Sequence, residues 1–124
     1  MFERAKLSLD ATKAALAKAE VPSTLKCAEA QSYGQSLAET QSANADVVAL
    51  LADLETTCDH ELPKATVNAA IAKAVKARAA QPDAPVLDEC FSGPFDLSLE
   101  DLKDAKDPEA SALELKFREV CPAR

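Results

Sequence analysis

Apolar side chains recur at intervals of three and four residues along most of the chain, which is the period of an amphipathic α-helix. In the N-terminal segment the repeating positions are Phe2, Ala5, Leu9, Thr12, Leu16 and Ala19. This spacing predicts a first helix over residues 3–20. Pro22 ends it, because a proline cannot continue the helical hydrogen-bond ladder, and Ser23 or Thr24 can cap the helix that follows.

Two more helices are predicted in the first half of the chain. The second covers residues 24–41, and its middle, around Tyr33 and Gly34, is a poor helix former that predicts a kink or fraying. The third begins near Ser42 or Asn44. Its buried positions are Val47, Leu50, Leu51 and Leu54.

The second half begins with a connection and a fourth helix. Residues 59–63 end in a proline and are expected to form the central connection. A fourth helix is predicted over residues 64–81, with apolar positions at Val67, Ala70, Ile71, Ala74 and Val75. Residues 83–97 contain proline and glycine at several points, so they are expected to be irregular chain.

Two start signals mark the last helices. The sequence from Ser98 to Asp101 resembles a capping box that opens a short helix. Asp107 can cap the final helix, with Pro108 at its first position, where the missing N–H costs nothing. The buried stripe of this helix is Leu113, Phe117 and Val120.

The composition agrees with this pattern. Alanine and leucine are far more frequent than isoleucine and valine, which favours helix over strand. Only two glycines occur in 124 residues, too few for the turns of a many-stranded protein. We therefore expect an all-α protein, a small bundle of about five to six helices in a single domain of residues 1–124.

At an offset of 63 residues the sequence resembles itself. The aligned cysteines are Cys27 with Cys90 and Cys58 with Cys121. The order of the predicted elements recurs as well, which favours an internal repeat of residues 1–63 and 64–124. Chance spacing within a helical bundle is the alternative.

The four cysteines are separated by 31, 32 and 31 residues and form no CxxC pair. Structural zinc sites bring their ligands in close pairs, so disulfides are favoured over a metal site, and inert buried thiols are the other alternative. The midpoints of the first and last intervals fall near Ser42 and Ala105, beside predicted turns. Antiparallel helical arms on either side of a turn bring the ends of each interval within disulfide distance. The predicted pairs are Cys27–Cys58 and Cys90–Cys121.

Disulfides indicate an oxidising compartment. The longest strongly apolar run, residues 47–52, is far shorter than the roughly 20 residues that cross a bilayer. The first charged side chain is Glu3, so the N-terminus has no apolar signal core. We expect a periplasmic or secreted protein whose signal sequence has been removed, without membrane insertion; a native cytosolic start is the alternative.

Catalytic chemistry has little support in the sequence. His60 is the single histidine and stands two residues after Cys58, but a thiol in a disulfide is neither nucleophile nor metal ligand. Phosphate loops, zinc-protease motifs and nucleophile elbows do not occur. We therefore expect no enzyme, no metal site and no cofactor.

The charge is unevenly distributed. The chain has 14 basic and 21 acidic residues, a net charge of −7, which argues against nucleic acid or an anionic membrane as partner. Residues 64–82 hold four basic side chains and no acidic one, whereas residues 83–109 hold nine acidic ones. The two segments either neutralise each other's field, or the acidic segment forms a surface that steers a basic protein partner.

Two aromatic residues fall inside the acidic segment. Phe91 and Phe95 are either core residues below a loop or the apolar centre of a binding patch with an acidic rim. The predicted partner-binding residues are Phe91, Phe95, Asp96, Glu100, Asp101 and Asp104.

These observations favour a non-enzymatic, exported protein–protein interaction module, such as an inhibitor or immunity-type protein with an acidic binding surface for a basic protein. The alternative is a helical carrier, in which alanines on facing stripes of the first and fourth helices leave space for a small apolar ligand. An enzyme with dispersed residues is the third hypothesis. The sequence predicts no oligomeric state.

Overall fold

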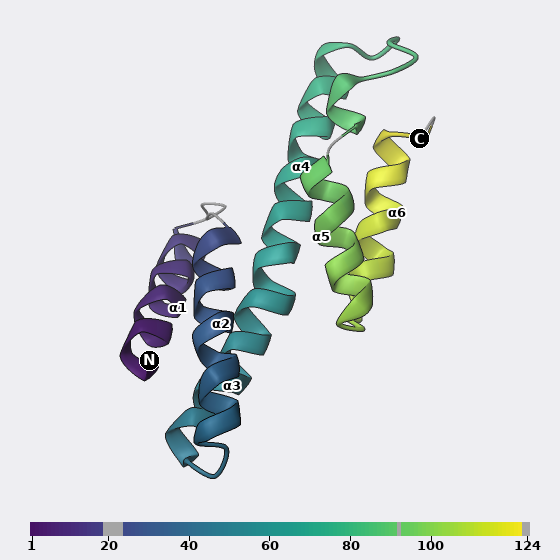
Figure 1. Ribbon diagram of the computed structural model, residues 1–124. Helices are drawn as coiled ribbons and strands as arrows, with labels where there is room; N and C mark the ends of the chain where they lie inside the picture. Colours follow the sequence, from purple (N-terminus) through teal and green to yellow (C-terminus); the bar gives the residue numbers. More distant parts are fainter. Residues whose placement is uncertain (19–23, 92, 123–124) are drawn as a thin grey trace. The chain divides into compact units, whose positions relative to one another are not determined.

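The computed structural model describes residues 1–18, 24–91 and 93–122, and over these ranges the chain forms helices and no strand (Figure 1). The elements are α1 (Phe2–Ala17), α2 (Thr24–Thr40), α3 (Ala45–Leu54), a π-helical segment η1 (Glu55–Glu61), α4 (Leu62–Ala80), a 3₁₀ turn η2 (Asp88–Cys90), α5 (Gly93–Asp104) and α6 (Ala110–Val120). The predicted all-α class and the predicted number of helices are confirmed.

The chain divides into two compact units, Met1–Leu62 and Pro63–Arg124, each with its own hydrophobic core. The single domain of residues 1–124 stays a prediction, and this division is compatible with the predicted internal repeat. Its boundary falls one residue before the boundary of the predicted repeat.

Unit 1, Met1–Leu62, is built on the predicted apolar stripes. Its core includes Ala5 and Leu9 of α1, Leu37 of α2, and Val47, Leu50 and Leu54 of α3. Asn44 caps α3 as predicted, because its side-chain oxygen accepts from the backbone N–H of Asp46 at 2.9 Å. The predicted helix end at Ala19 and Pro22 lies outside the described residues.

The structure corrects the expected weakness at Tyr33 and Gly34. Helix α2 continues through both residues without interruption. Gly34 is buried, and a Cβ atom there would stand 2.7 Å from Leu54 Cδ1 and 3.3 Å from Leu51 Cδ2. Glycine therefore serves a close approach of α2 to α3, and this packing outweighs its low helix propensity.

The predicted connection at residues 59–63 is wrong, because the chain is helical there. Segment η1 contains Cys58 and His60, and the Leu62 N–H that follows it bonds to the Thr57 oxygen, five residues earlier. Pro63 lies in the first turn of α4, where its missing N–H is tolerated. Pro63 therefore lies where the π-helical hydrogen bonds of η1 are followed by the α-helical hydrogen bonds of α4.

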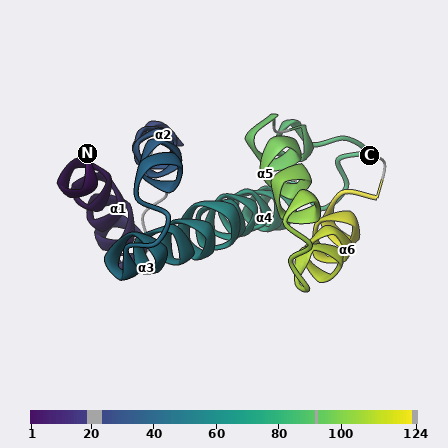
Figure 2. The same ribbon diagram turned by 60° about the horizontal axis from the view of Figure 1, so that its bottom comes forward.

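Unit 2, Pro63–Arg124, is formed by α4, η2, α5 and α6, and Figures 1 and 2 both show α5 and α6 side by side. Its core contains Val67, Ala74, Leu87, Phe95, Leu99, Leu102, Leu113 and Phe117. The rings of Phe95 and Phe117 stack with centroids 3.8 Å apart, so an aromatic pair joins α5 to α6.

Helix α5 begins five residues earlier than predicted. The residues from Gly93 onward are helical, so Ser98 lies inside α5 and does not open a capping box. Pro94 occupies the first turn, a position that a proline can take. The prediction of irregular chain over residues 83–97 is therefore wrong from Gly93 onward.

The turn between α5 and α6 is closed by backbone and side-chain bonds. Lys106 has a φ of 55°, and the Asp107 N–H bonds to the Leu102 oxygen at 2.9 Å, which is a Schellman ending with lysine at the left-handed position. Asp107 Oδ1 accepts from the Glu109 N–H at 2.8 Å, so the predicted capping residue caps this turn. Helix α6 begins at Ala110, which leaves Pro108 in the turn before it.

Candidate functional site

Both predicted disulfides are present. Cys27 pairs with Cys58 at a Cα–Cα distance of 5.6 Å, and Cys90 pairs with Cys121 at 5.7 Å. All four side chains are buried. Two buried disulfides fit a protein of an oxidising environment.

These bonds remove one chemical possibility near His60. Cys58 has no thiol, so it cannot act as a nucleophile or as a metal ligand. Within the part of the chain that the structure describes, no group of three His, Cys, Asp or Glu side chains could hold a metal ion. In the same residues, every helix is too short or too polar to span a bilayer.

The two aromatic candidates have opposite environments. Phe95 is 3% exposed and belongs to the core through its stack on Phe117, so it leaves the predicted binding set. Phe91 is 61% exposed. Phe95 is therefore a core residue, and Phe91 is a surface residue.

The four predicted carboxylates share the exposed side of α5. Residues Asp96, Glu100 and Asp104 follow one another at intervals of four, and Asp101 lies beside them. Leu97 stands among them with 71% of its surface exposed. We call Asp96, Leu97, Glu100, Asp101 and Asp104 the α5 acidic face.

Leu97 is absent from the predicted partner-binding residues, although its position in the sequence carries a signal. Phe95, Leu99 and Leu102 form the buried stripe of α5. Leu97 is two residues from Phe95, or about 200° around the helix, so it faces away from that stripe. A leucine out of phase with its own helix is the mark of an exposed apolar position.

One residue of the basic segment, Lys64, pairs with the acidic segment at the α5–α6 turn. Lys64 Nζ lies 3.0 Å from Glu109 and 3.5 Å from the buried carboxylate of Asp107. The hydrogen bond to Glu109 and the charges of both carboxylates raise the pKa of Lys64. Arg78 donates to the backbone oxygens of Ala84 and Val120.

A second charged contact links α5 to α6. Lys103 Nζ donates to Glu114 at 2.8 Å, and this hydrogen bond lowers the pKa of the Glu114 carboxyl. Lys103 stands three residues after Glu100 and seven after Asp96, so it borders the α5 acidic face.

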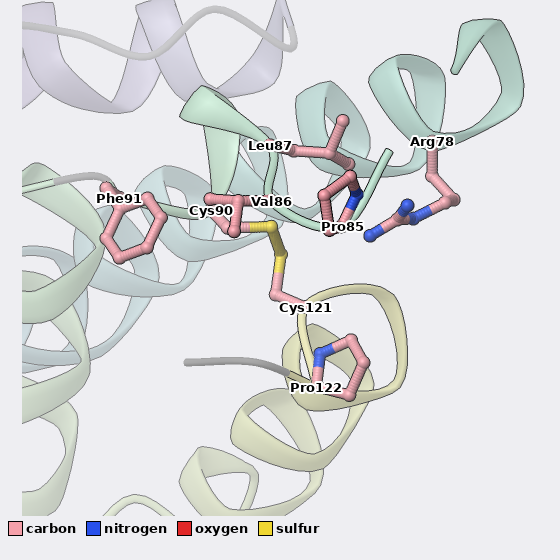
Figure 3. Close-up of a pocket in the computed structure, with 8 residues that line it drawn as sticks. All are labelled: Arg78, Pro85, Val86, Leu87, Cys90, Phe91, Cys121 and Pro122. Atoms are coloured by element: carbon pink, nitrogen blue, oxygen red, sulfur yellow. A yellow bond between two sulfur atoms is a disulfide. The ribbon is translucent and has the colours of Figure 1, made fainter. Parts of the chain in front are cut away.

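Phe91 forms part of an open groove of about 300 Å³ at the N-terminal end of α5. The lining residues are Ala70, Lys73, Asp88, Glu89, Phe91, Gly93 and Pro94. We call this the Phe91 groove. Figure 3 shows the ring of Phe91 turned away from the disulfide that Cys90 forms with Cys121.

A smaller cavity, also lined by Phe91, lies next to the disulfide (Figure 3). Arg78, Leu87 and Cys121 contribute to its lining, and its volume is about 10 Å³. This is room for about one water molecule, far less than a carrier needs for an apolar ligand.

The alanine stripes that suggested a carrier are packed within their own units. Ala5 of α1 is fully buried in the core of unit 1, and Ala74 of α4 is fully buried in the core of unit 2. Ala70, the other alanine of the fourth-helix stripe, is half-buried and lines the Phe91 groove.

Comparison with known proteins gives no family: no protein-family model, no curated protein and no solved structure matches this chain significantly. The α5 acidic face and the Phe91 groove therefore have to be interpreted from their own chemistry.

Proposed function

We propose that this chain is a non-enzymatic protein–protein interaction module, periplasmic or secreted, whose α5 acidic face binds a basic protein. An inhibitor or immunity-type role fits such a module. The observation that carries the proposal is Leu97, an exposed leucine among four carboxylates on one helix face.

The arrangement suits binding for two physical reasons. An exposed apolar side chain gains free energy when a partner removes it from water, so Leu97 can act as the centre of a contact. Carboxylates around it attract a positively charged partner over a range of about 10 Å at ordinary ionic strength and accelerate docking. Affinity for the partner should therefore fall as salt is added.

The disulfides support an exported role for this module. They hold the ends of each helical hairpin together, and bonds of this kind persist outside the reducing cytosol. A braced, small helical unit loses little conformational entropy when it binds, which favours affinity.

Charge neutralisation on α5 tests the proposal. The fourfold variant Asp96→Asn/Glu100→Gln/Asp101→Asn/Asp104→Asn keeps the shape of the face and removes its charge. A matched control, Glu3→Gln/Asp10→Asn/Glu29→Gln/Glu39→Gln, removes the same charge from exposed positions of unit 1. Each immobilised protein is incubated with the extracellular or periplasmic fraction of the source organism, and any captured protein is identified and purified.

We expect the wild type and the control to capture the same basic protein. Its Kd should rise at least about tenfold for the α5 variant and for Leu97→Ser, measured by calorimetry with purified partner. Equal affinity for all variants would contradict the proposal, as would a partner whose affinity is independent of salt.

A further inference from the structure

We propose that the Phe91 groove is a recognition pocket for an arginine side chain of the basic partner. This inference rests on the proposed function and names the chemical group that the partner presents.

The groove offers a flat apolar wall next to negative charge. Phe91 exposes 61% of its surface, which is unusual for a large aromatic side chain. Asp88 and Glu89 line the same groove, and Lys73 supplies its single positive charge. Two carboxylates against one ammonium leave the groove with a formal charge of −1.

A guanidinium group matches this combination better than other cations. It is planar, so it can stack on the Phe91 ring, and its N–H groups can pair with a carboxylate through two parallel bonds. A lysine ammonium can satisfy the charge but has no flat face to lay on the ring.

The groove is continuous with the α5 acidic face. Gly93 lines the groove and also lies one helical turn before Leu97, on the same side of α5. A basic segment that runs along α5 would therefore bring a side chain to the groove at the N-terminal end of the helix. Gly93 has open space around it, because a Cβ atom built there meets nothing within 4 Å.

Lys73 makes the charge of the occupant testable. If the occupant is a cation, removal of the Lys73 charge relieves repulsion and strengthens binding. If the occupant is a carboxylate, the same change weakens binding. The sign of the Lys73→Gln effect therefore decides which kind of group the groove accepts.

The experiment uses small probes, so it does not depend on a purified partner. N-acetyl-argininamide, its neutral isostere N-acetyl-citrullinamide, and N-acetyl-lysinamide are titrated into the ¹⁵N-labelled full chain. Backbone amide shifts around residues 88–94 report the groove. We expect saturable shifts with the arginine probe, weaker binding of the lysine probe and none of the citrulline probe.

Three variants and one control complete the test. Phe91→Ala should weaken arginine binding about two- to fivefold, and Gly93→Leu, which fills the groove without a change of charge, should abolish it. Lys73→Gln should tighten it about twofold. Leu115→Ala removes an apolar side chain of the same 61% exposure on α6 and should change nothing.

Equal binding of arginine and citrulline, no saturable shift at the groove, or weaker binding by Lys73→Gln would overturn the inference. These outcomes leave the proposed function intact if the α5 charge variant still loses its partner. Loss of the proposed function would instead appear as unchanged partner binding by that variant.

Discussion

In unit 1 the disulfide joins a residue inside α2 to the π-helical segment η1, whereas in unit 2 it joins the 3₁₀ turn η2 to the residue after α6. The sequence separation is 31 residues in both, and the Cα–Cα distances are 5.6 and 5.7 Å. The same spacing thus closes two hairpins whose cysteines lie on different local structures. The sequence interval between two cysteines therefore determines which parts of a hairpin are joined. It does not determine the secondary structure in which each cysteine lies.

The hydrophobic cores of the two units differ more than their disulfides do. Unit 1 is packed with aliphatic side chains around Gly34 and contains a buried hydroxyl, Thr57 Oγ1, with no hydrogen-bond partner among the described residues. Unit 2 has the Phe95–Phe117 stack and a buried carboxylate, Asp107, held by Lys64 and a backbone N–H. The buried carboxylate of unit 2 therefore has polar partners, whereas the buried Thr57 hydroxyl of unit 1 has no hydrogen-bond partner among the described residues. Substitutions at these two positions should change the free energy of unfolding in opposite directions.

The largest expected effect is the loss of a disulfide. In the chain-entropy model each bond contributes roughly 3–4 kcal/mol by restricting the unfolded chain, so the two double Cys→Ala variants should be destabilised alike. Hydrogen exchange should place the loss in residues 1–62 for the Cys27/Cys58 variant and in residues 63–124 for the Cys90/Cys121 variant. Equal loss of protection along the whole chain in either variant would show that the cores are not separate.

The next largest effect concerns Lys64 in unit 2. Lys64→Met leaves the Asp107 carboxylate buried without its cation, and we expect a loss of about 1–2 kcal/mol in urea unfolding. Lys73→Met, at an exposed position outside this cluster, should change stability by less than about 0.5 kcal/mol.

The same pair has a predictable pH dependence. The pKa of Lys64 is raised on folding from an ordinary value of 10.5, so its contribution is complete below that value and is lost as the pH rises through the higher folded pKa. The stability difference between wild type and Lys64→Met should therefore be constant near neutral pH and narrow above about pH 10.5. A difference that widens at alkaline pH would contradict the pairing.

The two glycines provide a matched comparison between units. Gly34→Ala forces a Cβ against Leu54, a cost of about 1–3 kcal/mol, partly offset by about 0.5–1 kcal/mol of helix propensity. We expect a net loss of about 1 kcal/mol. Gly93→Ala meets open space and should be neutral or slightly stabilising, so thermal unfolding of both variants tests the close approach of α2 to α3.

The unsatisfied hydroxyl of unit 1 predicts a stabilising substitution. Thr57→Val removes a buried polar atom without a change of shape and should raise the free energy of unfolding by about 1 kcal/mol. Thr12 is also buried, but its hydroxyl donates to the Ser8 oxygen at 3.1 Å. Thr12→Val should therefore be neutral or mildly destabilising, and a gain as large as that of Thr57→Val would contradict the assignment.

The smallest effect is expected at the α5–α6 turn. Lys106 holds a left-handed backbone conformation that glycine adopts at lower cost, so Lys106→Gly should stabilise unit 2 by about 0.5–1 kcal/mol. Lys116 lies exposed inside α6, and Lys116→Gly should cost about 1 kcal/mol instead. Calorimetric melting of the two variants should shift in opposite directions.

Much of the fold follows from local periodicity. The helices, the Asn44 cap and both disulfides could be predicted because each depends on a spacing that is visible in the sequence. The π-helical segment could not, since no spacing of residue types in Glu55–Glu61 distinguishes it from an α-helix. The role of Gly34 could not be predicted either, because the advantage of its missing side chain appears only when α3 is packed against it.

Only part of the candidate site could be predicted from the sequence. The distribution of charge along the chain predicts the carboxylates of α5, but a prediction of irregular chain over residues 83–97 gives no basis for separating Phe91 from Phe95. Extending the α5 stripe back from Leu99 to Phe95 would have assigned Phe95 to the core. The Phe91 groove depends on residues from α4, η2 and α5, and no local pattern brings these together.

The connectivity of the cysteines also bears on how the chain matures. The first cysteine pairs with the second and the third with the fourth, in the order in which they leave a ribosome or a translocation pore. The first bridge can therefore form before the later thiols emerge, and this order of pairing allows correct oxidation without reshuffling by an isomerase. A simple oxidase should be enough to bring the newly made polypeptide to its final covalent form.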